Sequence, residues 1–454
     1  MYESDARSAR DRWADLKRSF LKIHGSICAP SGFKCAAVFC DIKKLGTGKG
    51  SEKGRKEDLA LIVSDVPAVV AGMFTTNQVC AAPVKVSRKV AAKNFARAIV
   101  VNSGNANAAT GAQGLRDAEA TARQAASALR ELECNKHSSI SARRIGVSDV
   151  LVCSTGRIGV PMPMKNVEHG IRHCAPLLAR STSSARSVAE AIMTTDTRRK
   201  EIAVEFKVGG STVRIGGICK GAGMIQPGMA TMLAFITTDA VIEAAVLKRA
   251  LKIAVEQSFN RITVDGDMST NDSVIALASG LAGNSKSQIA GSSFQAALNY
   301  VCLELARMIV RDGEGTSRVV TLRVHGARND REAEAATRSI ANSSLVRASW
   351  CGGDPNWGRI LCALGYSKAR INEDHVDVGY APTGKHKILF AFRRGRPTNV
   401  PLKRLAKITS ASEFDLHVDL HCGRGGFAIY AADLTEDYVA FNKGDITDPV
   451  TLGG

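Results

Sequence analysis

The chain has 454 residues, of which 45% are hydrophobic and 23% are charged. That balance excludes a disordered protein, and no apolar run reaches the roughly eighteen residues that a membrane-spanning helix needs. The formal net charge of +18 is uneven, with +16 in residues 1–230 and +2 in residues 231–454. Such a basic half fits nucleic acid, small anionic ligands or a solvated surface, so charge alone does not choose among them.

The first half of the chain alternates apolar strands with loops and helices. Residues 1–32 carry charges of both signs and lack the apolar core of a signal peptide, which predicts an N-terminal arm. Two buried strands are expected at 58–65 and 68–77. A third strand leads into an asparagine- and glycine-rich loop within 96–114, and the 3.6-residue apolar period predicts a helix over 115–132.

Residues 149–163 predict a further strand, followed by a Thr155-Gly156 step and then a turn marked by proline. A threonine hydroxyl and a glycine N–H that point in one direction are what an oxyanion hole requires, and this step alone does not establish one. A helix that ends within 189–196 then leads to Thr197. Residues 201–221 predict a hairpin around a Gly-Gly turn.

The most informative stretch is 220–238, where a loop rich in glycine and proline precedes the apolar run that follows Thr231. A threonine inside a chain is a poor nucleophile. A threonine that begins a chain carries its own base, an α-amine with a pKa of about 8. One hypothesis is therefore cleavage of the Ala230–Thr231 bond, which would make Thr231 an N-terminal nucleophile. The alternative is a structural threonine at a junction between a loop and a strand.

The second half begins with an amphipathic helix over 242–259, followed by a strand, an acidic polar turn and another apolar element within 261–279. The turn lacks the glycine and the terminal glutamate of a calcium loop, so a network of turn hydrogen bonds is expected there. A helix over 293–310 precedes Glu314, which stands between two glycines. The last hundred residues are expected to form strands with glycine turns.

Cysteine and histidine spacing predicts no metal site. Twelve cysteines are spread along the chain without a CxxC pair, a pattern typical of reduced thiols in an intracellular protein. His417, His421 and Cys422 lie close together in sequence, but no further cluster completes a zinc site. The mixture of strands and helices predicts a layered α/β or α+β sandwich.

Taken together, nine segments resemble the ornithine acetyltransferase family, also called bifunctional glutamate N-acetyltransferase, of arginine biosynthesis. The resemblance runs from about Gly32 to Thr447 and favours the nucleophile hypothesis for Thr231. Its carriers are residues 58–77, 100–114, 154–163, 191–197, 220–240, 258–272, 312–318, 353–360 and 433–439.

The resemblance implies an αββα-type sandwich, similar in layering to N-terminal-nucleophile hydrolases. It also implies self-cleavage between Ala230 and Thr231 into an α chain (33–230, after the 1–32 arm) and a β chain (231–454), assembled as an α2β2 heterotetramer. Thr231 would take the acetyl group from N2-acetylornithine, release ornithine and form N-acetylglutamate from glutamate, without a cofactor, a metal, nucleic acid or a membrane. Acetyl-CoA as an additional donor is left open.

By position, the resemblance assigns Thr155 and Gly156 to the oxyanion hole. It assigns the following residues to substrate binding: Thr197, Lys220, Thr231, Glu314, Asn442 and Thr447. Lys220 suits a carboxylate, and Glu314 suits either the ornithine ammonium or the glutamate α-amine.

Two residues depart from the family pattern: Gly228 replaces an asparagine before Met-Ala-Thr, and Asp445 replaces an aromatic residue. Whether Gly228 slows self-cleavage, by altering the loop before Thr231, is left open by the sequence. One rival function is an N-terminal-nucleophile amidase or peptidase. The other is a non-catalytic binding protein on the same scaffold, whose basic α half would bind nucleic acid. The expected location is the cytoplasm, with the mitochondrial matrix or a plastid as alternatives.

Overall fold

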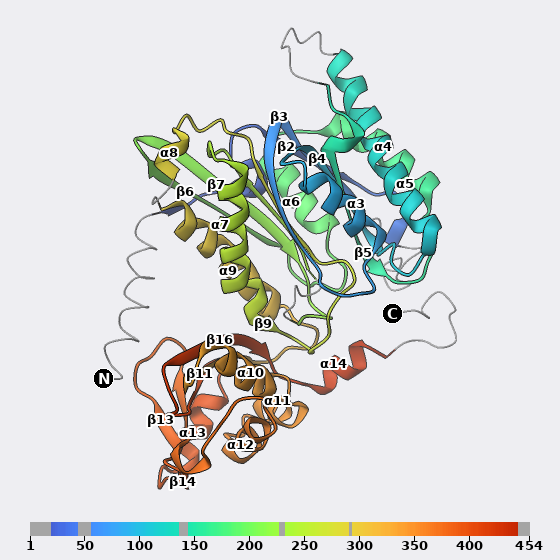
Figure 1. Ribbon diagram of the computed structural model, residues 1–454. Coiled ribbons are helices and arrows are strands. Elements are labelled where there is room, and N and C mark those ends of the chain that lie inside the picture. Colours follow the sequence, from blue (N-terminus) through green and yellow to red (C-terminus); the bar gives the residue numbers. More distant parts are fainter. Residues whose placement is uncertain (1–19, 44–55, 136–143, 227–231, 290–292, 444–454) are drawn as a thin grey trace.

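The computed structural model describes residues 20–43, 56–135, 144–226, 232–289 and 293–443. Figure 1 shows two bodies, each built on a β-sheet: a larger one above and a smaller one, formed by the C-terminal part of the chain, below. No helix in these ranges is long and apolar enough to cross a membrane.

The larger body contains a nine-stranded mixed sheet. Its strands, in spatial order, are β1 (Leu21–Lys22), β6 (Lys200–Val208), β7 (Ser211–Lys220), β8 (Leu233–Thr238), β10 (Ser273–Ala278), β3 (Leu59–Phe74), β4 (Phe95–Asn105) and β5 (Val150–Arg157), with β2 (Phe33–Val38) paired to β3. The β6–β7 hairpin around Gly209-Gly210 confirms the expected hairpin. Residues 20–32, part of the expected arm, contribute β1 and the fully buried Ile27 to this body.

The two strands expected at 58–65 and 68–77 are one strand, β3. Its pairing with β4 shifts register between Val63 and Ala68, and Pro67 lies in that interval. Proline has no N–H to donate to a ladder, so the interruption that suggested two strands is a local irregularity within one.

Successive side chains of β8 face opposite sides of the sheet and belong to different apolar clusters, which shows how the layers of this body are arranged. Ala234 and Ile236 of β8 share an apolar cluster with α7 (Ala244–Gln257) and α9 (Phe294–Arg311). The intervening Phe235 packs instead with Ile62 and Val101 from the β3–β4 side of the sheet. Because residues i and i+2 of a strand share a face, the sheet folds over an internal apolar layer.

The opposite outer face is covered by α4 (Gly111–Asn135) and α5 (Met164–Cys174), whose Leu129 and Ile171 pack against Leu61 and Val100. The order of layers is therefore helix, sheet, sheet, helix, as Figure 1 illustrates, and the expected αββα sandwich is confirmed. Among the described residues, three shorter helices also belong to this body: α3 (Ala82–Ala91), α6 (Thr182–Ala191) and α8 (Lys286–Ile289).

The smaller body contains a seven-stranded sheet. Its strands are β14 (Arg396–Pro397), β13 (Leu389–Arg393), β12 (Asp377–Pro382), β15 (Glu413–Asp419), β11 (Val319–Ala327), β16 (Gly425–Ala432) and β9 (Ile262–Thr263). Its helices are α10 (Asp330–Ala341), α11 (Ser344–Cys351), α12 (Trp357–Gly365), α13 (Leu402–Thr409) and α14 (Glu436–Phe441).

The last hundred residues are not strands and turns alone, because α12, α13 and α14 lie among them. In α13, the buried residues Leu405, Ile408 and Thr409 follow helical spacing and pack under the sheet. With only eight residues, α13 is too short for its helical apolar spacing to be distinguished from the alternating apolar pattern of a strand. A helix of this length depends on tertiary packing for its stability.

Candidate active site

Thr155 and Gly156 lie near the end of β5, beside β4. Gly156 has a φ of +128°, and a Cβ there would lie 2.3 Å from the carbonyl carbon of Gly104. Only glycine fits so close an approach of two backbones. Thr155 is 4% exposed, and its hydroxyl has no hydrogen-bond partner among the described residues, so the hydroxyl remains available to a ligand.

A loop that ends in Asn271 and Asp272 links this strand to the start of β8. The Asn271 side-chain amide donates to the carbonyls of Ser154 at 2.9 Å and Ala106 at 2.6 Å. The carboxylate of Asp272 accepts the Met232 N–H at 2.8 Å. Met232 is the residue that follows Thr231 in the chain. The expected turn network is therefore present, and it connects the Thr155 strand to the residue after Thr231.

Asp272 is 1% exposed, and its Oδ2 atom has no hydrogen-bond partner within the described part of the chain. Burial raises the pKa of Asp272 well above its usual value, opposed by the Met232 N–H and by Lys220. A neutral carboxyl group at this place can donate a hydrogen bond as well as accept one.

Ala230, Thr231 and Thr447 lie outside the described residues. Leu233, two positions after Thr231, pairs with Lys220 across β7 and β8. The backbone at the start of β8 is therefore adjacent to Lys220 as well as to Asp272.

Lys220 is the last residue of β7 and is 3% exposed. Burial lowers the pKa of its ammonium, while Asp196 acts in the opposite direction. The Lys220 Nζ lies 3.9 Å from Asp196 Oδ2, an ion pair longer than a hydrogen bond. A buried cation whose ion pair is this long is suited to receive a carboxylate from a ligand.

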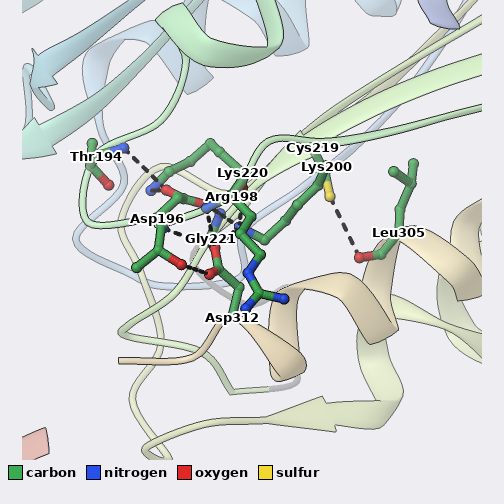
Figure 2. Close-up of polar contacts among 10 residues, drawn as sticks. Thr194, Asp196, Arg198, Lys200, Cys219, Lys220, Gly221, Leu305 and Asp312 are labelled. Carbon is green, nitrogen blue, oxygen red and sulfur yellow. Dashed lines mark hydrogen bonds and ion pairs between the residues drawn. The ribbon is translucent and has the colours of Figure 1, made fainter. Parts of the chain in front are cut away.

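Asp196 also belongs to a buried ionic cluster with Lys200 and Asp312 (Figure 2). The Lys200 Nζ lies 2.6 Å from Asp196 Oδ1 and 2.5 Å from Asp312 Oδ2. Burial would raise the pKa of Asp196, but Lys220, Lys200 and the Gly221 N–H together lower it to about 2. Burial likewise opposes the charge of Lys200, and the two carboxylates raise its pKa.

Asp312 in turn holds the exposed Thr197. Its carboxylate accepts the backbone N–H groups of Thr197 at 3.1 Å and Arg198 at 3.2 Å, together with the Thr197 hydroxyl. Thr197 and Lys220, which are distant in sequence, are thus connected through Asp312, Lys200 and Asp196.

Glu314 lies against Gly223, because a Cβ added there would be 2.5 Å from the glutamate carboxyl group. The Glu314 N–H donates to the Ala222 carbonyl at 2.9 Å. The Asn442 side-chain amide donates to Glu314 Oε2, also at 2.9 Å. Glu314 and Asn442, assigned to one site by the resemblance, are in direct contact.

Two groups of residues are therefore connected to the start of β8. Lys220 contacts it from β7 and is linked to Thr197 through the ionic cluster, and the Thr155 strand is linked to it through the Asn271–Asp272 loop. Glu314 and Asn442 lie against the loop that follows Lys220. Sequence reasoning missed five residues that build this arrangement, although four of them lie within the segments that carry the resemblance. They are Asp196, Lys200, Asn271, Asp272 and Asp312. No group of three or more candidate metal ligands occurs among the described residues.

The fold and this arrangement define a layered α/β protein with an ionic site where β7 and β8 meet. The profile of the ArgJ family matches residues 36–444, and the chain belongs to that family.

Several relatives are similar over nearly the whole chain. The "Arginine biosynthesis bifunctional protein ArgJ" of Symbiobacterium thermophilum is 44% identical over 421 residues, covering 92% of this chain and 98% of the relative. The "Glutamate N-acetyltransferase" of Methanocaldococcus jannaschii is 42% identical, with the same two coverages of 92% and 98%. A crystal structure of the ArgJ protein from Bacillus halodurans is 39% identical, with a TM-score of 0.43, covering 46% of this chain and 97% of that chain.

Proposed function

We propose that this protein is a glutamate N-acetyltransferase of arginine biosynthesis that moves an acetyl group from N2-acetylornithine to glutamate. The observation that carries the proposal is made at the start of the strand that follows Thr231. There the buried Lys220 pairs with Leu233, and the buried carboxyl group of Asp272 accepts the Met232 N–H. The names of the family relatives agree with glutamate N-acetylation in arginine biosynthesis.

In this proposal the chain cleaves itself between Ala230 and Thr231. The products are an α chain that ends at Ala230, with residues 1–32 as its N-terminal arm, and a β chain, 231–454, which stay associated as an α2β2 heterotetramer. Cleavage gives Thr231 a free α-amine, which then acts as the base for its own hydroxyl.

Acetyl transfer proceeds in two steps. The Thr231 oxygen attacks the acetyl carbonyl carbon, and the C–N bond to ornithine breaks. The α-amine relays the hydroxyl proton to the leaving nitrogen, so ornithine departs and acetyl-Thr231 remains. The glutamate α-amine then attacks the acetyl carbon, and the ester C–O bond to Thr231 breaks. The proton lost by the glutamate nitrogen passes through the Thr231 α-amine to the threonine oxygen, which restores the hydroxyl and releases N-acetylglutamate. Thr155 and the Gly156 N–H stabilise the oxyanion of both tetrahedral intermediates.

The charged residues of the site bind the groups of opposite charge on the two amino-acid substrates. Lys220 receives a carboxylate, and Glu314, oriented by Asn442, receives an ammonium group. Thr197 and Thr447 complete the contacts. No cofactor or metal takes part in this chemistry, and the expected location is the cytoplasm.

The experiment is to purify the wild-type protein and the Thr231→Ala variant and measure their intact masses. The wild type should give two chains, the second beginning at Thr231, and the variant should give one. With acetylornithine alone, the β chain should become about 42 Da heavier, the mass that one acetyl group adds to a nucleophile. Addition of glutamate should remove this mass and release N-acetylglutamate. Release of free acetate instead would identify an amidase, and a fully active, uncleaved chain would refute the mechanism.

A further inference from the structure

The contact between Thr197 and Asp312 fixes the direction of a hydrogen bond. An ionised carboxylate has lone pairs and no proton, so it can only accept. Asp312 pairs with the Lys200 ammonium and accepts the backbone N–H of both Thr197 and Arg198. The hydroxyl of Thr197 therefore donates its single proton to Asp312.

That donation determines what Thr197 offers to a ligand. A hydroxyl has one hydrogen and two lone pairs, and here the hydrogen is used inside the protein. Thr197 is exposed, whereas Asp312 beneath it is 8% exposed. The hydroxyl oxygen of this exposed residue can accept a hydrogen bond from a ligand but cannot donate one.

Building on the proposed function, we propose that Asp312 is a positioning residue that makes Thr197 an acceptor for the α-nitrogen of both amino-acid substrates. The two substrates must share the group that Thr197 recognises, because they occupy one site in turn. Glutamate has N–H donors only on its α-nitrogen, whereas ornithine has a second amine at the end of its side chain. The α-nitrogen is the donor common to both. The substrate carboxylates, which only accept, go to Lys220.

The rest of the ionic cluster keeps this acceptor in place. Lys200 bridges Asp312 to Asp196, and both carboxylates are buried (Figure 2). Thr197 and Asp312 lie on opposite sides of the proposed cleavage point. The cluster therefore connects the two chains after cleavage and holds Thr197 in the same orientation.

The test compares three ligands by calorimetric titration of the cleaved protein. Ornithine has both nitrogens, norvaline keeps the α-nitrogen alone, and 5-aminopentanoate keeps the terminal nitrogen alone. Thr197→Val should weaken ornithine and norvaline by about tenfold or more, the usual value of a hydrogen bond to a charged group. The affinity for 5-aminopentanoate should not change. Thr197→Ser, which restores the hydroxyl, should restore the wild-type pattern.

Asp312→Asn tests the direction of the bond. Its amide nitrogen can donate to Thr197 and free the hydroxyl proton to face the ligand, so it should reduce the preference for ligands with an α-nitrogen. Adding Asp312→Asn to Thr197→Val should cause no further loss of that preference, since both act through one contact. Asp239→Asn is the control, because Asp239 is also buried and accepts two backbone N–H groups, from Ser31 and Arg214, away from the cluster.

Equal weakening of all three ligands by Thr197→Val, or no weakening, would overturn the inference while leaving acetyl transfer intact. If Asp312→Asn does not fold, the Val and Ser variants decide the question by themselves. A wild-type protein that binds neither ornithine nor norvaline would instead refute the proposed function, and this inference with it.

Discussion

The larger and smaller bodies each contain a buried basic side chain, and the two are satisfied differently. In the nine-stranded body, Lys200 is 1% exposed on its side chain and pairs with the carboxylates of Asp196 and Asp312. In the seven-stranded body, the guanidinium of Arg347 donates to the backbone carbonyls of Val264, Ala432 and Asp433.

The difference separates a structural cation from one that organises chemistry. Backbone carbonyls are fixed and neutral, so Arg347 joins the end of β16 to the loop after β9 through groups that do not titrate. Carboxylates are ionisable and can accept further hydrogen bonds. Lys200 therefore fixes two carboxylates that have other partners: Asp312 binds Thr197, and Asp196 forms an ion pair with Lys220. Burial alone does not reveal function; the type of partner does.

Removal of Lys200 and of Arg347 should give the largest difference in activity between the two bodies. Lys200→Met leaves two buried carboxylates without their cation, which costs about 3–5 kcal/mol of unfolding free energy, and should abolish acetyl transfer. Arg347→Met leaves neutral carbonyls unpaired, at about 1–3 kcal/mol per group, and should leave kcat/KM unchanged. Urea unfolding and steady-state kinetics on both variants measure the contrast. Equal kinetic losses would show that Arg347 also orders the site.

Thr155→Ala should lower kcat by roughly a hundredfold, the usual result of removing one oxyanion donor, with little loss of stability. The reason is that the Thr155 hydroxyl has no protein partner to lose among the described residues. Thr237 is the matched control, a buried threonine of the same sheet whose hydroxyl donates to the Ile27 carbonyl at 2.8 Å. Thr237→Ala should destabilise the fold without changing kcat, and the reverse pattern would remove Thr155 from the mechanism.

Gly223→Ala should displace Glu314, because the new methyl group would lie 2.5 Å from its carboxyl group. We expect KM to rise by about tenfold, since crowding of this kind typically costs about 1–3 kcal/mol. The control is Gly365→Ala at the end of α12, where an added Cβ meets nothing within 4 Å. An unchanged KM in the Gly223 variant would mean that Glu314 moves aside without cost.

The sequence alone predicted the layered α/β class, the β6–β7 hairpin and the helices α4, α7 and α9, because these elements repeat an apolar period over many residues. It did not predict α13 or the continuity of β3, since a short helix and an interrupted strand depend on their neighbours.

The same limit applies to the site. The resemblance supplied Thr197, Lys220, Glu314 and Asn442, whereas the cluster that contacts the first two joins carboxylates more than a hundred positions apart. Only the folded chain brings such charges together. Asp196 and Asp312 were therefore beyond local pattern reading, even though each lies next to or near a residue already singled out.

The variant Asp272→Asn should remove the ionisable group at this position while keeping its hydrogen bond to Met232. Asparagine keeps an acceptor oxygen for the Met232 N–H, so the start of β8 should stay in place. Burial raises the pKa of Asp272 in the folded protein, whereas the unfolded chain loses this proton near the ordinary value of about 3.9. Above that value the folded state binds more protons than the unfolded state, so its stability falls as the pH rises, until the folded pKa is passed.

The variant carries no such proton. Its unfolding free energy relative to wild type should therefore rise with pH, by at most about 1.4 kcal/mol per unit, and then level off. Urea unfolding of both proteins across the range from pH 4 to pH 8, within about four units of the ordinary carboxyl pKa, measures this difference. A flat difference would mean that Asp272 titrates alike in both states. If the difference in unfolding free energy rises with pH and the variant also has a lower kcat, then the ionisable group of Asp272 lowers stability but contributes to catalysis.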